Sequence, residues 1–352
     1  MAELMDYLQR VVDDDASDLF IIAGGPVSQK LDNQLVPIGK ERVLPQESKE
    51  LIAGLYARAD RSMDYLGQKD DDFSFSVPGL ARFRVNAYQQ RGSLAAVVRV
   101  VPFSIPDWRE LNIPQQVIDL SQVTHGMILV TGTAGSGKST TQACIIDQIN
   151  QNRSAQIITL EDPIEYLHRN QKSIVSQREI AIDTEDYLAA LRACLRQAPD
   201  VILLGEMRDH ETIHTAMSAA ETGHLLLATL HTKGAKNTID RIVGSFPSME
   251  QEQIRSQLAM VLHTVVSQQL LPDVKGSMVP AYEIMRMTDA VSNLVRENKT
   301  HQLDNAIAGG RKDGMITMDQ SILELFQAGQ ITQETAVTYA DNPEQMKRRI
   351  GS

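Results

Sequence analysis

One stretch of the chain has the residue types and spacing needed to hold the phosphates of a nucleotide. It reads Gly132-Thr133-Ala134-Gly135-Ser136-Gly137-Lys138-Ser139, which matches the P-loop pattern G-x-x-x-x-G-K-[ST]. Glycines let the backbone approach a phosphate closely, and the N-terminus of a following helix adds partial positive charge. We expect Lys138 to reach the β- and γ-phosphates of ATP, Ser139 to bind Mg²⁺, and Thr140 to complete the ATP-binding segment.

The residues on either side favour the strand, loop and helix order that a P-loop needs. Met127-Ile128-Leu129-Val130 is a short apolar run, typical of a buried strand. The segment 140–150 follows, with isoleucines that one face of a helix would bury. A glycine-rich turn that matches by chance would not be expected to have both flanks, so the sequence predicts a nucleotide-binding loop.

Carboxylates follow two later apolar runs. Glu161 and Glu165 come after the run 156–160, and Glu206 comes after the run 201–204. Open α/β sheets bind their ligands at the carboxyl ends of the strands. These side chains are therefore candidates for orienting or deprotonating the water that attacks the γ-phosphate, and the choice between Glu161 and Glu165 stays open.

Glu206 and His231 have further expected roles. The commoner P-loop arrangement has an aspartate at the strand end that supports Mg²⁺, whereas this chain has Gly205 there and Glu206 beside it. We therefore expect Glu206 to support the metal site, by shared ligation or through water. His231 follows the apolar run 225–230 and is a candidate sensor of the γ-phosphate, while His224 before that run is equally suited to hold the sheet together.

Arginines recur in the first hundred residues. Residues 81–87 alternate apolar and polar side chains, which places Arg82 and Arg84 on one face of a strand. Each of these arginines could simply lie on a solvent-exposed face of the sheet, and this explanation is as good as a functional role. The functional alternative is a guanidinium supplied to the nucleotide of a neighbouring subunit, which is worth ~10³–10⁵ in rate where it has been measured. On this basis Arg82, Arg91 and Arg99 are candidate ATP-binding residues.

The pattern of elements changes at the proline-bracketed stretch 102–106. Before it, the sequence predicts helices at 2–12, 45–57 and from 61, and strands at 19–22, 27–31, 35–38, 73–77, 81–87 and 94–101. After the P-loop, predicted strands at 156–160, 201–204 and 225–230 alternate with helices at 186–196 and 211–221. This order predicts a small α+β domain at 1–106, a linker at 107–122 and an α/β domain with a parallel sheet at 123–352. Residues 249–271 are expected to form a core-packed helix, and 289–349 a run of helices.

The amino-acid composition indicates which partners and which cellular location to expect. The 352 residues include 34 basic and 45 acidic side chains, a net charge of −11, so no nucleic-acid partner is expected. No apolar run approaches the roughly 18 residues that span a bilayer, and the N-terminus lacks a secretory pattern, so a cytoplasmic protein is expected. Cys144 and Cys194 form no C-x-x-C pair and are expected to be buried apolar residues rather than zinc ligands.

Four motifs in order resemble those of the secretion-ATPase superfamily, and in particular the type IV pilus retraction ATPases of the PilT and PilU kind. They are the P-loop, Glu161-Asp162-Pro163-Ile164-Glu165, Gly205-Glu206-Met207-Arg208-Asp209, and the histidine motif from Glu221 to His231. Ser17-Asp18-Leu19 and residues 82–86 extend the resemblance over nearly the whole chain. It implies a RecA-like P-loop ATPase domain preceded by a smaller PAS-like α+β domain.

The resemblance also implies an activity and partners. Members of this family form homo-hexameric rings that use ATP and Mg²⁺ to drive pilus disassembly through an inner-membrane platform protein. Such a ring would be peripheral to the inner membrane through protein contacts. The related pilus extension ATPases carry an extra N-terminal domain and a four-cysteine metal site, which this sequence lacks, so retraction is favoured over extension.

One departure bears on the role within that family. PilT proteins usually carry Ala-Ile-Arg-Asn-Leu-Ile-Arg-Glu near the C-terminus, whereas residues 290–297 have Ser292 in place of the first arginine. The tail from Ile331 is slightly nearer to the PilU kind, which assists a principal retraction ATPase. Three hypotheses follow: a principal motor, an accessory ring subunit with weak turnover that supports a paralogous ATPase, and, less favoured, a nucleic-acid translocase.

Overall fold

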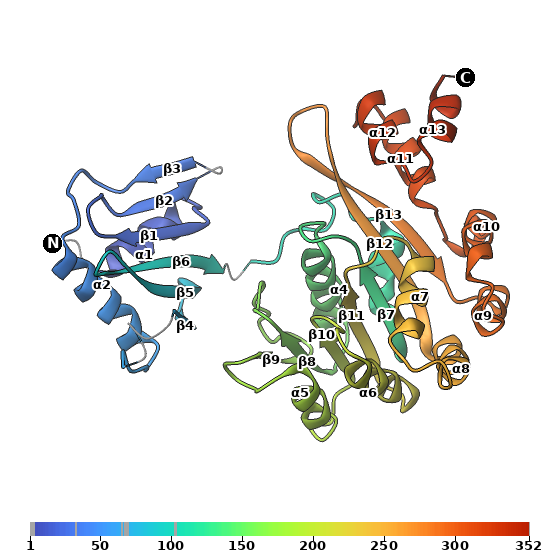
Figure 1. Ribbon diagram of the computed structural model, residues 1–352, viewed down its shortest axis with the longest axis horizontal. Helices are drawn as coiled ribbons and strands as arrows, with labels where there is room; N and C mark the ends of the chain where they lie inside the picture. Colours follow the sequence, from blue (N-terminus) through green and yellow to red (C-terminus); the bar gives the residue numbers. More distant parts are fainter. Residues whose placement is uncertain (1–3, 32–33, 65, 67–69, 102–103, 352) are drawn as a thin grey trace. The chain divides into compact units, whose positions relative to one another are not determined.

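The computed structural model describes residues 4–31, 34–64, 66, 70–101 and 104–351. They form two compact units, the first from Met1–Ser104 with Glu165–Leu167 and the second from Ile105–Ile164 with His168–Ser352. Each unit has its own sheet, so each is described separately (Figure 1).

A six-stranded antiparallel sheet forms the first unit, in the order β3-β2-β1-β6-β5-β4. Two helices pack against it, and their Leu8, Ile52 and Leu55 are buried in one core with Leu19 and Phe83 of the strands. The elements are α1 (Leu4–Asp13), β1 (Asp18–Ile22), β2 (Ser28–Leu31), β3 (Gln34–Pro37), α2 (Pro45–Arg58), β4 (Asp71–Val77), β5 (Ala81–Gln90) and β6 (Ser93–Val101). The predicted α+β composition of this region is confirmed.

The alternation predicted for residues 81–87 is also confirmed. Ala81, Phe83 and Val85 are buried, whereas Arg82 and Arg84 are half-buried on the other face. The sequence also predicts that strands 27–31 and 35–38 form a hairpin around Asp32-Asn33, and these two residues lie outside the described residues.

The helix expected from residue 61 is wrong, since the described residues between 61 and 67 form none. Arg61 instead forms an ion pair with Asp71 at 2.6 Å, and Tyr56 Oη donates to the same carboxylate at 2.9 Å. Asp71 is only 4% exposed, and a buried carboxylate needs such partners. This tertiary pairing outweighs the local helical pattern of the segment.

A seven-stranded sheet forms the second unit, in the order β13-β12-β7-β11-β10-β8-β9. All its pairings are parallel except that of β12 with β13, which confirms the predicted α/β class. Its strands are β7 (Gly126–Thr131), β8 (Gln156–Glu161), β9 (Ile174–Glu179), β10 (Val201–Leu204), β11 (Leu225–Leu230), β12 (Leu262–Pro272) and β13 (Met278–Arg286).

Helices cover both faces of this sheet (Figure 1). One face packs against α3 (Gln115–Ile118) and α4 (Lys138–Asn152). The other packs against α5 (Tyr187–Cys194), α6 (His210–Glu221), α7 (Ala235–Gly244) and α8 (Gln251–Val261). The segment 107–122 places Val117 and Leu120 in the first of these cores, and its predicted role as a linker stays a prediction.

The expectation of one helix over residues 249–271 is wrong beyond Val261. There α8 ends and the chain continues as β12, where the adjacent Val265 and Val266 are both buried. A central strand covered on both faces buries consecutive residues, so its apolar run also fits a helical spacing. The antiparallel partner β13 was not predicted.

The C-terminal part follows β13 and is helical, as expected. It contains α9 (Asp289–Arg296), α10 (Leu303–Gly309), α11 (Met318–Gln327), α12 (Gln333–Tyr339) and α13 (Pro343–Ile350). The last three pack beside the hairpin of β12 and β13, drawn in orange in Figure 1, where Leu271 and Val279 share a core with Met318 and Ile322. These helices therefore rest on the strands next to the P-loop strand.

Candidate nucleotide-binding site

The carboxyl ends of parallel strands bring the predicted site residues to one edge of the second sheet. Thr131 of β7 pairs with Leu230 of β11, and Leu204 of β10 pairs with Leu160 of β8. The residues that directly follow these positions are Gly132, His231, Gly205 and Glu161. This is the edge at which open α/β sheets bind their ligands.

The P-loop runs from β7 into α4 in the predicted order. Gly132, Gly135 and Gly137 have φ values of 143°, 74° and 86°, a range that favours glycine. A Cβ atom at Gly132 would lie 2.3 Å from the Gln268 carbonyl oxygen, and one at Gly137 would lie 2.8 Å from Gln268 Nε2. Glycine is therefore required at both positions by the backbone conformation and by the lack of room.

The Lys138 side chain is buried and bends back over this loop. Its Nζ donates to the carbonyl oxygens of Gly132 at 3.0 Å and Thr133 at 2.8 Å. Ser136 Oγ, buried in the same loop, has no hydrogen-bond partner among the described residues. An ammonium group and an unpaired hydroxyl in a glycine-lined loop at a helix N-terminus fit a phosphate group.

Strand β12 supports the P-loop from the side. Gln268 is 3% exposed, and its Oε1 accepts a hydrogen bond from Thr141 Oγ1 of α4 at 2.7 Å. Its other atoms are those that would meet a Cβ at Gly132 or Gly137. Gln268 thus fixes the start of α4 relative to β12 and limits the shape of the loop.

Glu206 and His231 lie close together, because they follow the neighbouring strands β10 and β11. His231 Nε2 is 3.9 Å from Glu206 Oε2, and Arg208 pairs with the other carboxylate oxygen. The Glu206 side chain is 15% exposed. A carboxylate between a guanidinium and an imidazole at this edge is placed to accept a proton or to bind a metal ion through water.

Tyr187 explains why glycine occupies position 205. A Cβ there would lie 2.8 Å from Tyr187 Oη and 3.1 Å from the Leu160 carbonyl oxygen, so an aspartate does not fit. Thr229 Oγ1 of β11 also donates to the Gly205 carbonyl oxygen. Burial, and then the charges of Glu206 and Asp162, raise the pKa of the Tyr187 phenol. The phenol therefore stays protonated beside these carboxylates.

Glu161 belongs to the second unit, as Glu206 does, whereas Glu165 does not. Glu161 Oε1 accepts hydrogen bonds from Thr159 Oγ1 at 2.6 Å and Gln177 Nε2 at 3.2 Å, which orient it at the end of β8. Glu165 is exposed and groups with the first unit. Glu161 therefore lies at the edge of the second sheet, and the choice between Glu161 and Glu165 as the catalytic carboxylate stays a prediction.

The candidate arginines all belong to the first unit. Arg82 lies on β5, and Arg91 occupies the turn between β5 and β6 with a φ of 47°. Arg99 Nε donates to Asp18 Oδ1 at 2.9 Å, so this side chain already has a partner within its own unit. The proposed role of these arginines at a nucleotide stays a prediction.

Three residues at the site had no assigned role in the sequence analysis: Tyr187, Gln268 and Thr229. No local signal marks them, because each reaches the site through the pairing or packing of strands distant in sequence. Arg208 lies within a quoted motif, and its position two residues after Glu206 was the available clue.

Other sequence predictions concern groups away from this edge. His224 lies at the opposite end of β11, where its Nδ1 is 2.9 Å from the Ala219 carbonyl oxygen of α6, and its proposed structural role stays a prediction. Both cysteines are buried and free, as expected. The described residues contain no cluster of three or more histidine, cysteine or acidic side chains arranged to hold a metal ion. Within the same residues, no helix has the length and apolar character needed to cross a membrane.

Comparison with known proteins places this site in a family. The family model described as "Type II/IV secretion system protein" matches residues 3–349. The chain belongs to this family. Its fold is the RecA-like ATPase domain with an N-terminal domain that the sequence predicted.

Two relatives and one solved structure within this family are similar over nearly the whole chain. The type IV pilus retraction ATPase PilT of Pseudomonas aeruginosa is 43% identical over 331 residues, 94% of this chain and 95% of that protein. The type IV pilus ATPase PilU of the same organism is 37% identical over 350 residues, 99% of this chain and 91% of that protein. The crystal structure of the pilus retraction motor PilT with bound ADP matches with a TM-score of 0.90 and 41% identity, covering 99% of this chain and 100% of that chain. Identity is higher to PilT, whereas the match to PilU covers more of this chain.

Proposed function

We propose that this protein is an ATPase motor that powers retraction of type IV pili. The observation that carries the proposal is the meeting of a P-loop, the Glu206–His231 pair and Glu161 at one edge of a parallel sheet. The similarity to pilus retraction ATPases over nearly the whole chain supports the same activity.

The geometry supports a separate role for each of these residues during ATP hydrolysis. Loop 132–139 binds the phosphates, and Lys138 Nζ exchanges its two carbonyl partners for phosphate oxygens. Glu161 or Glu165 orients the attacking water in line with the bond that breaks, and His231 beside Glu206 senses the γ-phosphate. Positive charge from Lys138, and from Arg82, Arg91 and Arg99 of a neighbouring subunit, stabilises the charge of the transition state.

A magnesium ion completes the proposed site. Ser139, next to Lys138 in the first turn of α4, would hold the ion, with Glu206 supporting it through water. Ser and carboxylate oxygens are ligands that Mg²⁺ prefers. The ion would neutralise the β- and γ-phosphate oxygens.

The proposal includes an assembly and partners. A homo-hexameric ring lets the arginines of one subunit act at the P-loop of the next. The ring is cytoplasmic and acts on the inner-membrane platform protein of the pilus, to which it is held by protein contacts.

An accessory role is the second candidate, and one position favours it. Ser292 of α9 is 8% exposed, and the flanking Val291 and Val295 are fully buried. A serine is thus packed where PilT proteins usually carry an arginine, which changes the charge of this helix. An accessory subunit of the PilU kind would form rings, turn over ATP weakly and support a paralogous retraction ATPase.

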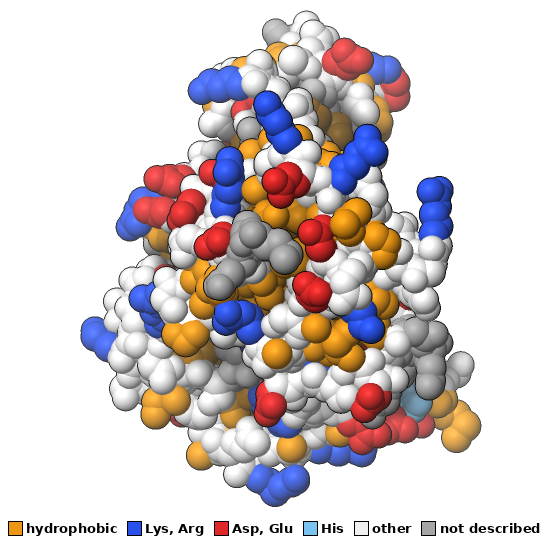
Figure 2. Space-filling model, turned by 90° about the vertical axis from the view of Figure 1, so that its left-hand side faces the viewer, with side chains coloured by type: hydrophobic (Ala, Val, Ile, Leu, Met, Phe, Trp, Pro, Cys, Tyr) orange, Lys and Arg blue, Asp and Glu red, His pale blue; other side chains and the backbone are white. Residues whose placement is uncertain are grey.

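A nucleic-acid translocase is disfavoured by the distribution of charge. On the face drawn in Figure 2, the coloured Lys and Arg side chains are interspersed with Asp and Glu and do not join into a stripe. Nucleic-acid binding requires a continuous basic footprint.

A turnover assay separates these candidates. Purified protein is expected to hydrolyse ATP with Mg²⁺, and Lys138→Ala is expected to remove at least about 99% of the turnover. Stimulation by DNA would support the translocase, and absent turnover in intact hexamers would support the accessory role. A deletion strain that retracts pili normally would contradict the principal motor.

A further inference from the structure

Glu283 is a buried carboxylate that is not part of the nucleotide site described above. It lies on β13 with an exposure of 6%. It pairs in register with Ser267 of β12, which in turn pairs with Thr131 at the end of the P-loop strand. Glu283 therefore lies two strands from the P-loop, at the same edge of the sheet. Burying a carboxylate is costly unless it makes strong hydrogen bonds, so its partners matter.

The first partner is the helix that follows the histidine motif. Glu283 Oε1 accepts a hydrogen bond from Ala235 N, the first residue of α7, at 2.7 Å. The residue before it, Gly234, has no side chain to cap α7, and its own N–H donates to Ser267 Oγ at 2.9 Å. The N-terminus of α7 is thus capped by the neighbouring strands β12 and β13. A carboxylate at a helix N-terminus also has a favourable interaction with the helix dipole.

This cap holds the loop that carries His231. Only residues 231–234 connect the end of β11 to α7, and His231 lies 3.9 Å from Glu206 at the other end of this loop. Lys233, between them, lines a cavity of about 390 Å³ together with residues 133–136 of the P-loop. A shift of the α7 N-terminus would therefore move His231 and Lys233 at the nucleotide site.

The strand that carries Glu283 is also attached to the C-terminal helical part. On either side of Glu283, Tyr282 N donates to Ser321 Oγ of α11 at 3.0 Å, and Ile284 exchanges two backbone hydrogen bonds with Ile316.

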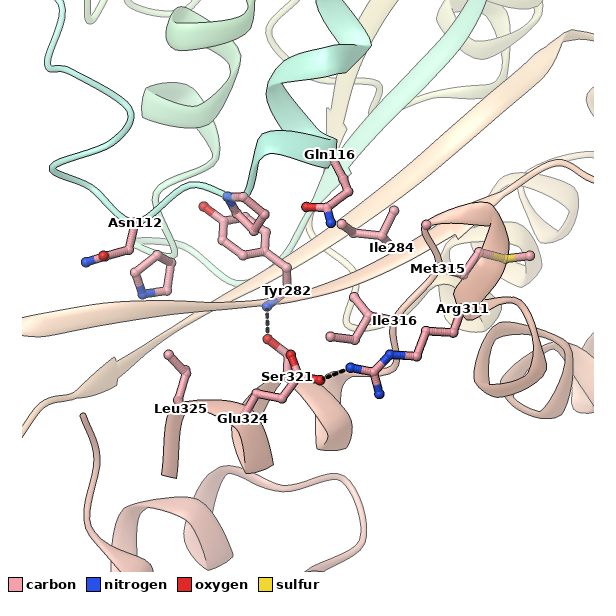
Figure 3. A pocket seen from close by; sticks show the side chains of 13 residues that line it. Asn112, Gln116, Tyr282, Ile284, Arg311, Met315, Ile316, Ser321, Glu324 and Leu325 are labelled. Carbon is pink, nitrogen blue, oxygen red and sulfur yellow. Dashed lines mark hydrogen bonds and ion pairs between the residues drawn. The ribbon is translucent and has the colours of Figure 1, made fainter. Parts of the chain in front are cut away.

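Figure 3 shows the opposite side of this attachment. Tyr282 and Ser321 both line a cavity of about 380 Å³, where the Tyr282 backbone nitrogen points to Ser321 Oγ and the ring extends away from it, and Arg311 pairs with Glu324 of α11. Adjacent residues of a strand point to opposite faces of the sheet. The Tyr282 side chain therefore lines this cavity, while the Glu283 side chain caps α7.

We propose that Glu283 is a positioning residue that holds loop 231–234 at the nucleotide and links it through β13 to α11. The structural reason is that its carboxylate accepts from the first amide of α7, while the residues on either side of it in β13 are hydrogen-bonded to segment 316–321. The chemistry at the γ-phosphate and the position of the C-terminal helices are thereby joined through Glu283 and its strand. This inference rests on the proposed role of His231.

The test compares Glu283→Gln with Glu324→Gln. Glutamine keeps the size of the side chain but replaces the carboxylate with a neutral amide, so the charge-assisted hydrogen bond to Ala235 N is lost. Glu324 is a matched control, because it is an acidic residue of α11 whose partner is Arg311 and not α7. Glu283→Gln is expected to lower kcat about tenfold, the effect of losing one charge-assisted hydrogen bond, while the Kd for ADP changes less than about twofold. Glu324→Gln is expected to match the wild type in both quantities.

Hydrogen exchange supplies a readout that a merely structural role would not move. An ATP analogue that is not hydrolysed is expected to slow exchange in residues 235–244 and 318–327 together in the wild type and in Glu324→Gln. In Glu283→Gln the two segments are expected to respond independently. Joint protection and wild-type kcat in Glu283→Gln would overturn the inference, and so would a parallel loss of ADP affinity and thermal stability. His231→Ala tests the underlying assignment separately, because wild-type turnover in that variant contradicts the role of His231 whatever Glu283 does.

Discussion

Position 205 lies at the end of β10 with little room for a side chain. The hydroxyl of Tyr187 and the carbonyl oxygen of Leu160 occupy the space that a Cβ would need. The carboxylate at this strand end belongs instead to the next residue, Glu206, and lies between Arg208 and His231.

The first prediction follows from this crowding. Gly205→Ala is expected to destabilise the protein by about 1–3 kcal/mol, because an added methyl group overpacks a rigid site. The double variant with Tyr187→Phe is expected to recover part of this loss, since it removes the hydroxyl at 2.8 Å but leaves the Leu160 carbonyl oxygen. Thermal unfolding measures both.

Gly244→Ala is the control for this prediction, since a Cβ at Gly244 meets no atom within 4 Å. It is expected to unfold at the wild-type temperature or slightly above. Strictly additive effects of the Gly205 and Tyr187 changes would contradict the steric explanation.

The second prediction concerns pH. Burial, followed by the charges of Asp341 and Asp304, raises the pKa of Glu283 to about 7 from its ordinary 4.5, although the amides of Ala235 and Met318 oppose the shift. The folded state therefore holds this proton more tightly than the unfolded state. Its contribution to stability is complete below about pH 4.5 and is lost as the pH rises to about 7, a loss on the order of 3 kcal/mol.

Glutamine does not titrate, so Glu283→Gln removes this loss. Urea midpoints at pH 5, 6, 7 and 8 are expected to move in favour of the variant, relative to the wild type, as the pH rises. Parallel curves for the two proteins would show that Glu283 does not titrate in this range.

At the scale of elements, the P-loop depends on β12, a strand that its motif does not contain. Gln268 of β12 accepts from Thr141 of α4 and lies against the two glycines that start and end the loop turn. The hairpin of β12 and β13 also supports α11–α13 through the core around Leu271 and Val279. The same pair of strands thus supports the nucleotide loop on one edge and the C-terminal helices on the other.

The third prediction tests the support from β12. Gln268→Ala is expected to raise the KM for ATP about tenfold and to lower stability by about 1–3 kcal/mol, because Thr141 Oγ1 loses its acceptor in a buried site. Thr141→Val breaks the same bond from the other side. The double variant is expected to cost less than the sum of the two, as contacting residues do in a double-mutant cycle. Full additivity in KM would mean that the two side chains act separately.

At the scale of the whole molecule, the chain forms two units with separate cores, and the candidate arginines and the P-loop belong to different units. In the proposed ring, the arginines of one subunit would complete the site of its neighbour.

The fourth prediction tests this arrangement by mixing subunits. Lys138→Ala keeps the arginines and lacks the P-loop lysine, whereas Arg82→Ala keeps the P-loop. Each variant alone is expected to lose about 99% or more of its turnover, in line with the ~10³-fold effect of an arginine supplied by a neighbour. Mixed rings are expected to regain turnover, since some wild-type P-loops then face wild-type arginines.

Turnover in such mixtures is measured against ring composition. Arg109→Ala, whose side chain pairs with the exposed Asp107 of the second unit, serves as a control that is expected to keep wild-type turnover. Mixtures that equal the weighted mean of their components would contradict action between subunits.

The sequence by itself determined the nucleotide loop, because its chemistry is local. Eight consecutive residues supply the glycines, the lysine and the hydroxyl, and the flanking apolar runs predict the strand and helix that hold them. The alternation at 81–87 and the order of the motifs could also be read from neighbouring residues alone, and the structure and the comparisons confirmed the two-part fold.

The tertiary structure alone decided which side chains surround the P-loop. Gln268 and Tyr187 reach the site, and Glu283 reaches the start of α7, only because strands and helices distant in sequence pair and pack there. Residues 262–271 became a strand rather than a helix because β7 and β13 offered their backbone groups on both sides. Local periodicity does not show which distant segments will pair or which residues they will bury. These long-range contacts therefore could not be predicted from the sequence.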